Sequence, residues 1–332
     1  MLALVLSWAG LQAEPTNGSP NSPVAAGTVS ATNDPVEVEY EKLLELDDLA
    51  AQEIDNWILE NQKFAAEGAG APEKELGQRI DKRRESVRHA YERFIQQHPN
   101  HGRARLAFAS FLEDSHDLDG ALEQMLKAKE VEPSNPAAWN NLANYYGHFG
   151  EVTNAFAHYE QAIKLDPSEA VYYHNFGTTV FLFRKDVKEY YGINEQQVFD
   201  KALQLYSNSL ALDPTNFLLA TDIAMTYYGI KPPRNAEAVK AWKYALNLAE
   251  GSLQREGVII HLGRVALNSG EFDKARHYLN SVTNAELIEL RDRVLRNLDS
   301  KEHPSPEASP EPSTPDTNSA PAAPRSLRLN PD

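Results

Sequence analysis

The stretch that decides the fold is PAAWNNLANYYGHFGEVTNAFAHYEQAIKLDP, which runs from Pro136 to Pro167. Its first half places apolar residues at i, i+3, i+4 and i+7, one face of an α-helix, at Trp139, Leu142, Ala143 and Tyr146. Two glycines follow near the end of that pattern, where left-handed helix caps are common. A second helical pattern then runs through Ala155, Tyr159, Ala162, Ile163 and Leu165. The stretch therefore predicts two helices joined by a short turn.

Proline repeats at a fixed distance on either side of this stretch. Pro99, Pro133 and Pro167 are 34 residues apart, and Pro214 follows after 47, which is one period plus a 13-residue insertion. Each proline ends a helical pattern, because proline cannot donate to the helix ladder. A fixed period in this range indicates a repeat architecture.

This pattern resembles the tetratricopeptide repeat (TPR), which has Trp, Leu, Gly/Ala and Tyr on a first helix and Ala, Phe/Tyr, Ala and Pro on a second. Neighbouring stretches carry matching residues, among them Phe108, Ala121, Pro133, Tyr173, Gly177, Ala202, Ala224, Trp242, Gly263 and Ala275. The resemblance implies an all-α fold, a right-handed superhelical solenoid of helix-turn-helix repeats with disordered termini. The expected repeats are 102–135, 136–169, 170–216 with an insertion at 184–194, 217–251 and 252–283.

Flanking segments complete this organisation. Residues 35–101 are expected to form an N-terminal helical region with a degenerate repeat, in which a long helix near 37–64 pairs with a helix at 83–97. Residues 284–300 are expected to form a capping helix, since a solenoid needs its open end covered. Residues 14–34 and the proline-rich tail at 301–332 have the composition of a disordered linker and tail.

The N-terminal residues 1–13 are predicted to be a signal peptide, because an apolar run precedes Ala13 and is too short to span a bilayer. No basic residue precedes the run, so a stray apolar terminus or a short anchor is the alternative. A secreted or periplasmic protein is expected, with a cytoplasmic one as the alternative. No other stretch is apolar for long enough to cross a membrane.

Charge and cysteine content limit the function. The 48 acidic and 32 basic residues give a formal net charge of -16, which would repel a nucleic-acid backbone and favours solubility or a basic partner. The sequence has no cysteine, which excludes disulfides, thiolate metal sites and cysteine nucleophiles.

In the TPR family the first helices line a concave groove that holds a peptide or helix. The resemblance places these residues in that groove: Arg103, Ser110, Asn140, Asn141, Asn144, His148, His174, Asn175, Thr178, Thr221, Asp222, Tyr228, His261 and Arg264. Asparagine suits peptide binding because its amide both donates and accepts hydrogen bonds. The alternative is that asparagine is tolerated on any wet helix face.

One TPR subclass binds C-terminal carboxylates through two asparagines and three basic residues. Asn144 and Asn175 match the two asparagines, but Asn140, Leu218 and Asp222 stand at the basic positions. Because the positive charge is missing, binding of a carboxylate in that manner is not expected.

The insertion carries Lys185, Lys188, Tyr190 and Tyr191, and Asn194 with Gln197 resembles a capping box that starts the next helix. We expect a solvated loop whose tyrosines pack on the edge of the solenoid. A contact surface is the alternative, since Tyr and Lys are good contact residues.

No pattern of catalytic, cofactor-binding or metal-binding residues is found. His98 and His101 flank a turn without further ligands nearby, and solvated turn histidines are expected. Glu113, Asp114 and Asp117 cluster at helix ends, which is typical of caps and solvated surface. There is no HExxH motif, phosphate-binding loop or nucleophile elbow.

The sequence therefore predicts a non-catalytic scaffold or adaptor that binds a peptide or protein segment, without nucleic acid, cofactor or membrane span. A self-assembling structural solenoid is one alternative. The other is an accessory subunit of an envelope enzyme that uses the groove as a cleft, with His148 and His174 as the residues to test.

Overall fold

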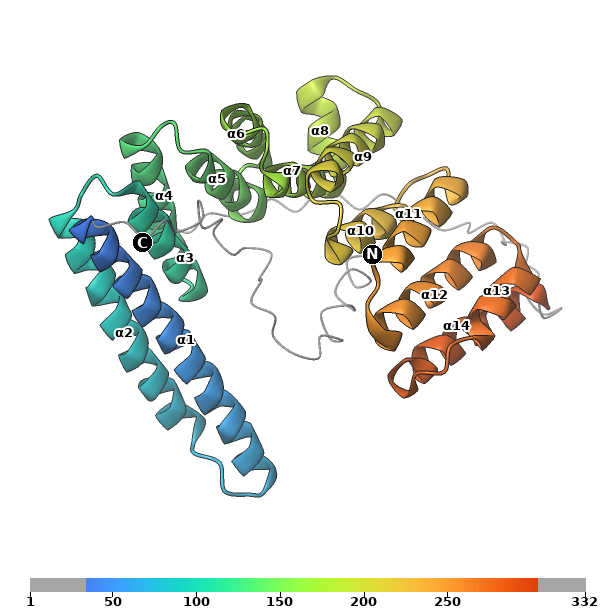
Figure 1. Ribbon diagram of the computed structural model, residues 1–332, viewed down its shortest axis with the longest axis horizontal. Coiled ribbons are helices and arrows are strands. Elements are labelled where there is room, and N and C mark those ends of the chain that lie inside the picture. The colour runs from blue at the N-terminus through green and yellow to red at the C-terminus, as the bar shows by residue number, and fades with distance from the viewer. Residues whose placement is uncertain (1–33, 304–332) are drawn as a thin grey trace, which may run out of the picture. The chain divides into compact units, whose positions relative to one another are not determined.

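The computed structural model describes residues 34–303, and every regular element in that range is a helix (Figure 1). The predicted signal peptide and almost all of the predicted linker and tail lie outside the described residues. The chain forms two compact units that divide between Pro233 and Arg234.

The first unit contains ten helices within its described residues. Their bounds are α1 Pro35–Ala66, α2 Glu73–Gln97, α3 Gly102–Asp114, α4 Leu118–Val131, α5 Pro136–Phe149, α6 Val152–Leu165, α7 Ala170–Leu182, α8 Arg184–Tyr191, α9 Glu195–Leu212 and α10 Phe217–Thr226.

The second unit contains α11 Asn235–Leu248, α12 Gly251–Asn268, α13 Phe272–Asn280, a 3₁₀ turn at Ala285–Leu287 and α14 Ile288–Glu302. The predicted repeat 217–251 is thus divided, with its first helix in one unit and its second in the other.

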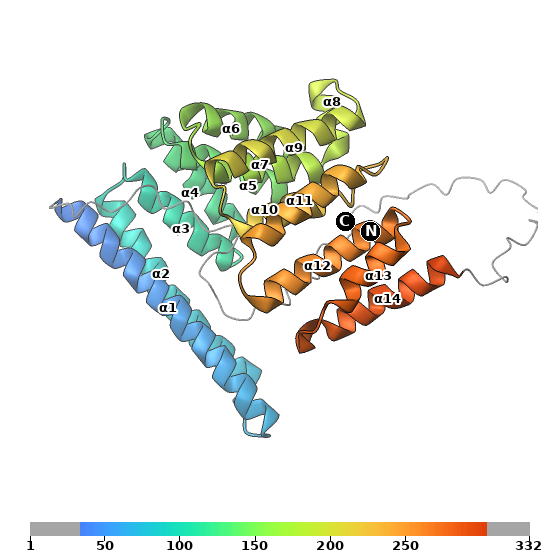
Figure 2. The ribbon, with the colours of Figure 1, turned by 45° about the vertical axis from the view of Figure 1, so that its right-hand side comes forward.

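Helix pairs make up the first unit: α3 packs against α4, α5 against α6, and α7 against α9, as Figures 1 and 2 show. Short turns separate the helices because polar side chains cap the starts. Asp117 accepts from the backbone N–H of Gly120, and Asn135 and Asn216 do the same for α5 and α10. The predicted all-α stack of helix-turn-helix units is confirmed.

Small and large side chains alternate in the core of these pairs. Ala143 of α5 and Ala155 of α6 are fully buried and let the two backbones approach. Large rings fill the spaces between neighbouring pairs: the Tyr159 ring of α6 stacks on Phe176 of α7, with centroids 5.3 Å apart.

The N-terminal region is a hairpin of two long helices, α1 and α2, which confirms the expected pairing (Figure 2). Both helices also contact α3, where Tyr91 of α2 stacks on Phe108 at 5.1 Å. The Tyr91 hydroxyl donates to Asp47 of α1 at 2.6 Å, and burial raises the pKa of the Asp47 carboxyl.

The insertion differs from the expected loop, because residues 184–191 form helix α8. Its single buried residue, Val187, anchors it to the core beneath. The tyrosines pack on the neighbouring pair as expected: the ring of Tyr190 lies 5.1 Å from Phe156, and the Tyr191 hydroxyl donates to Glu160 at 2.6 Å. The predicted capping box at Asn194 is confirmed.

In the second unit, the ring of Trp242 on α11 is fully buried and stacks on His261 of α12 at 4.1 Å. The last helix, α14, buries Val294 and Leu298 and packs against α12 and α13. It thereby covers the end of the core, as a capping helix should.

Within residues 34–303, none of the helices combines the length and the apolar character that a membrane span requires.

Replacing Gly177 by alanine tests how closely α7 and α9 approach. An added Cβ would lie 3.0 Å from two carbons of the Tyr206 ring, which is buried and held by Thr178. We expect the free energy of unfolding to fall by about 1–2 kcal/mol despite the better helix propensity of alanine. Chemical denaturation would measure this change.

The matched control is Gly77→Ala on α2, where an added Cβ meets nothing within 4 Å. This variant should gain about 0.5–1 kcal/mol, because alanine loses less conformational entropy in a helix. A gain of the same size at Gly177 would show that the crossing of α7 and α9 tolerates a side chain.

Candidate functional site

The first helices of the pairs form one surface in the first unit. Helix α3 contacts α5, α5 contacts α7, and a polar contact between His174 and Asp222 joins α7 to α10, with 3.2 Å between Nε2 and Oδ2. We call the surface formed by α3, α5, α7 and α10 the first-helix surface. It brings together nine of the residues expected in a groove, namely Arg103, Asn140, Asn141, Asn144, His148, His174, Asn175, Thr178 and Asp222.

All nine residues were expected to be exposed in a groove, but Asn140 is buried, with only 1% of its surface accessible to solvent. Its Oδ1 accepts from Nδ2 of Asn175 at 3.3 Å, and its own Nδ2 donates to Asn141 at 3.4 Å. A buried amide needs such partners, and here Asn175 of the adjacent helix supplies one and Asn141 of the same helix supplies the other. Asn140 therefore joins α5 to α7 and does not present its amide to a groove, which corrects the expectation.

A shallow pocket lies between the two helices α3 and α5. Its lining combines polar groups with one thioether and one ring, from Ser110, Glu113, Met125, Asn141, Asn144, His148 and Phe149. Three of the predicted groove asparagines and histidines, Asn141, Asn144 and His148, thus share one pocket with the predicted Ser110.

Asn144 is held in this pocket by a residue of the second helix. The buried Tyr159 hydroxyl donates to its Oδ1 at 2.7 Å, and Thr179 in turn donates to the Tyr159 oxygen at 3.1 Å. Because the amide oxygen is used by the protein, the NH₂ group of Asn144 is the donor that a ligand could meet.

Glu113 is the chemically distinctive group of the pocket. Its side chain is half-buried, and among residues 34–303 no cationic group pairs with its carboxylate. Burial, followed by the charge of the adjacent Asp114, raises the pKa of Glu113 to about 7. The expectation of a fully solvated acidic cluster is therefore wrong for Glu113, whereas Asp117 is the helix cap that was expected.

Thr178 and His174 of α7 are fixed by the next helices. The Thr178 hydroxyl lies 3.0 Å from the Tyr206 hydroxyl, and His174 pairs with Asp222. These contacts hold the side chains in one arrangement, so a ligand would meet a surface that is already ordered.

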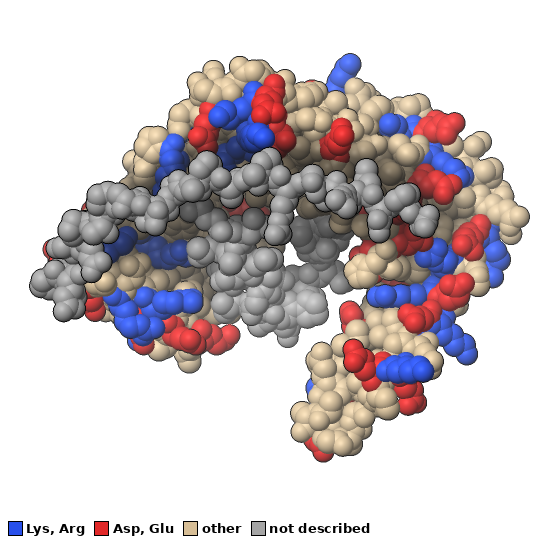
Figure 3. Space-filling view, turned by 180° about the vertical axis from the view of Figure 1, so that it is seen from behind, with Lys and Arg blue, Asp and Glu red and all other residues tan. Residues whose placement is uncertain are grey.

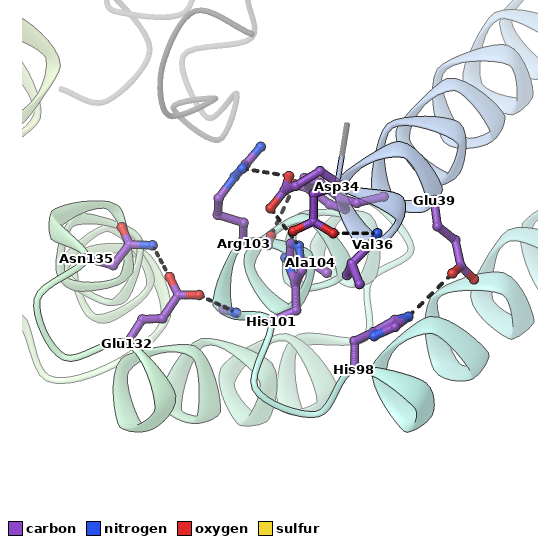
Figure 4. Close-up of polar contacts among 12 residues, drawn as sticks. Asp34, Val36, Glu39, His98, His101, Arg103, Ala104, Glu132 and Asn135 are labelled. Atoms are coloured by element: carbon purple, nitrogen blue, oxygen red, sulfur yellow. Dashed lines mark hydrogen bonds and ion pairs between the residues drawn. The ribbon is translucent and has the colours of Figure 1, made fainter. Parts of the chain in front are cut away.

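Arg103, at the start of α3, is bound to the N-terminal hairpin (Figure 4). Its Nη1 lies 3.0 Å from a carboxylate oxygen of Glu37, and its backbone carbonyl accepts from Tyr40. The side chain is about a third exposed. Much of its charge is therefore used to dock α1 and is not available to a ligand.

His101, next to Arg103, is not the solvated turn histidine that was expected. Its side chain is 11% exposed, and its Nδ1 accepts from the backbone N–H of Ala104 at 3.0 Å, so that the ring caps α3. Burial lowers the pKa of His101. Nearby, Glu132 accepts from Gly102 and Asn135 and closes the turn between α4 and α5 (Figure 4).

Two of the expected groove residues, His261 and Arg264, belong to the second unit. His261 is 2% exposed beneath the Trp242 ring, and burial lowers the pKa of His261 to about 3. Its place in an open groove is therefore corrected: the imidazole is part of the core of this unit. Arg264, one turn further on α12, is half-buried.

A second depression lies beside the insertion and is lined by Leu182, Phe183, Arg184, Lys185, Asp186, Lys188 and Glu195. Arg184 is already engaged, because it lies 3.8 Å from Glu195 and donates to the carbonyl of Phe181. Acidic and basic groups are mixed here, which gives the depression no clear charge preference.

Charges are also mixed on the face drawn in Figure 3, where Lys or Arg and Asp or Glu side chains lie in small neighbouring groups. No single large field of one sign covers the described atoms of that face. Among residues 34–303, no three His, Asp or Glu side chains are arranged to hold a metal ion.

Sequence reasoning did not identify Glu113 and Phe149 as pocket residues. Glu113 lies one helical turn after Ser110 on the same helix, and that spacing was the available signal. Phe149, the last residue of α5, is 54% exposed, and nothing in its local pattern separates it from a core position.

The shifted pKa of Glu113 predicts a pH-dependent stability. The folded-state value of about 7 lies above the ordinary 4.5, so the folded chain keeps a proton that the unfolded chain has lost. Stability therefore falls as pH rises through this window. In wild type, the free energy of unfolding should decrease between pH 4.5 and about pH 8. In Glu113→Gln this decrease should be smaller by about 1–3 kcal/mol, as measured by denaturant unfolding at the two pH values.

Glu123→Gln is the control, because Glu123 is an exposed carboxylate on α4 that lies outside the pocket. Glu123→Gln should change the pH dependence of stability less than Glu113→Gln does, because Glu123 pairs with Lys127 on the exposed surface. An equal pH response in the two variants would contradict the raised pKa of Glu113.

Comparison with known proteins gives one family match. Residues 112–170 match the family model described as tetratricopeptide repeat. No curated protein matches the chain.

Three solved structures illustrate the similarity. PilF of Pseudomonas aeruginosa is 14% identical over 76% of this chain and 99% of its own, with a TM-score of 0.49. YrrB, described as a TPR protein with an unusual peptide-binding site, is 17% identical over 64% and 98%, with a TM-score of 0.47. MamA is 22% identical over 52% and 92%, with a TM-score of 0.40.

The family match covers the turn after α3, helices α4 and α5, and α6, which is the region that contains the stretch Pro136–Pro167. Residues 112–170 are thus similar to the tetratricopeptide repeat, and they lie within a chain that is built of repeating helix pairs.

Proposed function

We propose that this protein is a non-catalytic scaffold that binds an extended peptide segment of a partner protein on its first-helix surface. The observation that carries the proposal is the pocket between α3 and α5, where Ser110, Asn141, Asn144 and His148 come together. Hydroxyl, amide and imidazole groups can pair with the N–H and C=O groups of a peptide backbone without regard to its sequence.

Preorganisation of the surface supports this function. Asn140 with Asn175, Asn144 with Tyr159, and Thr178 with Tyr206 are each joined by a hydrogen bond of 3.3 Å or less. Side chains that are already fixed lose little rotamer entropy when a ligand binds, so more of the contact energy appears as affinity.

The test is peptide selection on the full chain. Peptides selected from a random display library would be titrated against wild type and against the double variant Asn141→Ala/His148→Ala. Both residues lie in the pocket, and His148 is exposed. Because Asn141 also accepts from the buried Asn140, denaturant unfolding of the double variant would establish that its fold persists. We expect the affinity to fall by about tenfold or more, because two ligand-facing polar groups are lost.

The control is Gln204→Ala/Asn208→Ala on α9, a second helix, which removes two polar side chains that bond each other. It should change the affinity less than about twofold, since it lies outside the first-helix surface. Failure to select any peptide, or equal losses in the two double variants, would contradict the proposal.

A further inference from the structure

We infer that the pocket between α3 and α5 selects a basic side chain, Lys or Arg, of the bound peptide, with Glu113 as its charge partner. This inference rests on the proposed function and adds to it the chemistry of the segment that is bound.

The first support is the carboxylate itself. Glu113 lines the pocket, is half-buried, and has no ion pair with any residue of the described chain. Elsewhere in the first unit, carboxylates of similar burial are paired: Glu37 contacts Arg103, and Asp47 accepts from Tyr91. A half-buried carboxylate without a partner is costly, and an incoming cation would remove that cost.

The second support is the aromatic ring of Phe149, which lines the same pocket as Glu113. Phe149 lines the pocket with 54% of its surface exposed, and its ring packs on Tyr145 at 5.5 Å. An exposed aromatic face next to a carboxylate is a favourable site for an ammonium or guanidinium group.

The charges around the pocket agree with a cationic ligand. The acidic Asp114 of α3 acts on Glu113, and the acidic Asp119 of α4 acts on Tyr145, which packs on Phe149. Arg84 and His116 act on Asp114. His148 of α5 is the titratable group of the pocket that would oppose a cation when protonated. A basic ligand should therefore bind better at about pH 8, where Glu113 is charged.

The experiment uses pools of short peptides in which one position is fixed as Lys, Arg, norleucine or Glu and the others are mixed. Binding to the full chain would be followed by fluorescence anisotropy at about pH 8. At one position, wild type should prefer Lys or Arg over norleucine by about tenfold, and disfavour Glu.

Glu113→Gln should reduce that preference to about twofold or less, because it weakens binding of the Lys and Arg pools more than binding of the norleucine pool. Glu123→Gln, with the same change of charge outside the pocket, should keep the preference. Glu113→Gln is expected to fold, because it removes a carboxylate that burial destabilises.

Two results would overturn the inference in different ways. If the pools bind but show no preference for a basic residue, or if Glu113→Gln keeps the preference, the pocket does not select a cation and the proposed peptide binding stands. If no pool binds the wild-type chain, both the inference and the proposed function are wrong.

Discussion

Close approach of the two helices in each pair is the constraint on which the first unit depends. Gly177 leaves only enough room for the ring of Tyr206, and the alanines at positions 143 and 155 play the same part in the pair before. Since the helix backbones are close, a long side chain of the second helix reaches past the first. The hydroxyls of Tyr159 and Tyr206 therefore arrive at the first-helix surface, where they bind Asn144 and Thr178.

Packing and function are thus connected through the same side chains. The rings of these tyrosines belong to the core, and their hydroxyls orient polar groups that a ligand would meet. A substitution that loosens the helix crossing would therefore also disturb the orientation of the surface amides, without touching them directly. For this reason, separate measurements of stability and peptide affinity are needed for any variant of the first-helix surface.

The helix pairs could be predicted from the sequence because apolar spacing, capping residues and proline positions all indicate the same boundaries, as in 136–167. Helix α8 could not, since a single buried residue, Val187, holds it and leaves almost no periodic signal. The capping box at Asn194 was predictable because it depends on two residues three positions apart.

Prediction of the site was limited by a different factor. A helical pattern tells which face a residue occupies, but not how close the next helix comes. Asn140 and Asn141 are sequence neighbours, yet one is buried between helices and the other lines the pocket. His261 shows the same effect, because the Trp242 ring covers it. The pKa of Glu113 likewise depends on how deeply its side chain is buried, which no local pattern contains.

The N-terminal hairpin has an uneven distribution of buried residues along its length. Those of α1 end at Ile54 and those of α2 begin at Val87, so residues 55–86 bury no side chain fully. That distal part is joined instead by polar and charged contacts, including Arg79 over the Trp57 ring at 3.8 Å and Arg83 with Glu53 at 2.6 Å. Its local opening should therefore cost much less free energy than opening the base and should depend on ionic strength. The end of the hairpin next to α3 is therefore stabilised by buried side chains, whereas the stability of its distal end depends on salt concentration.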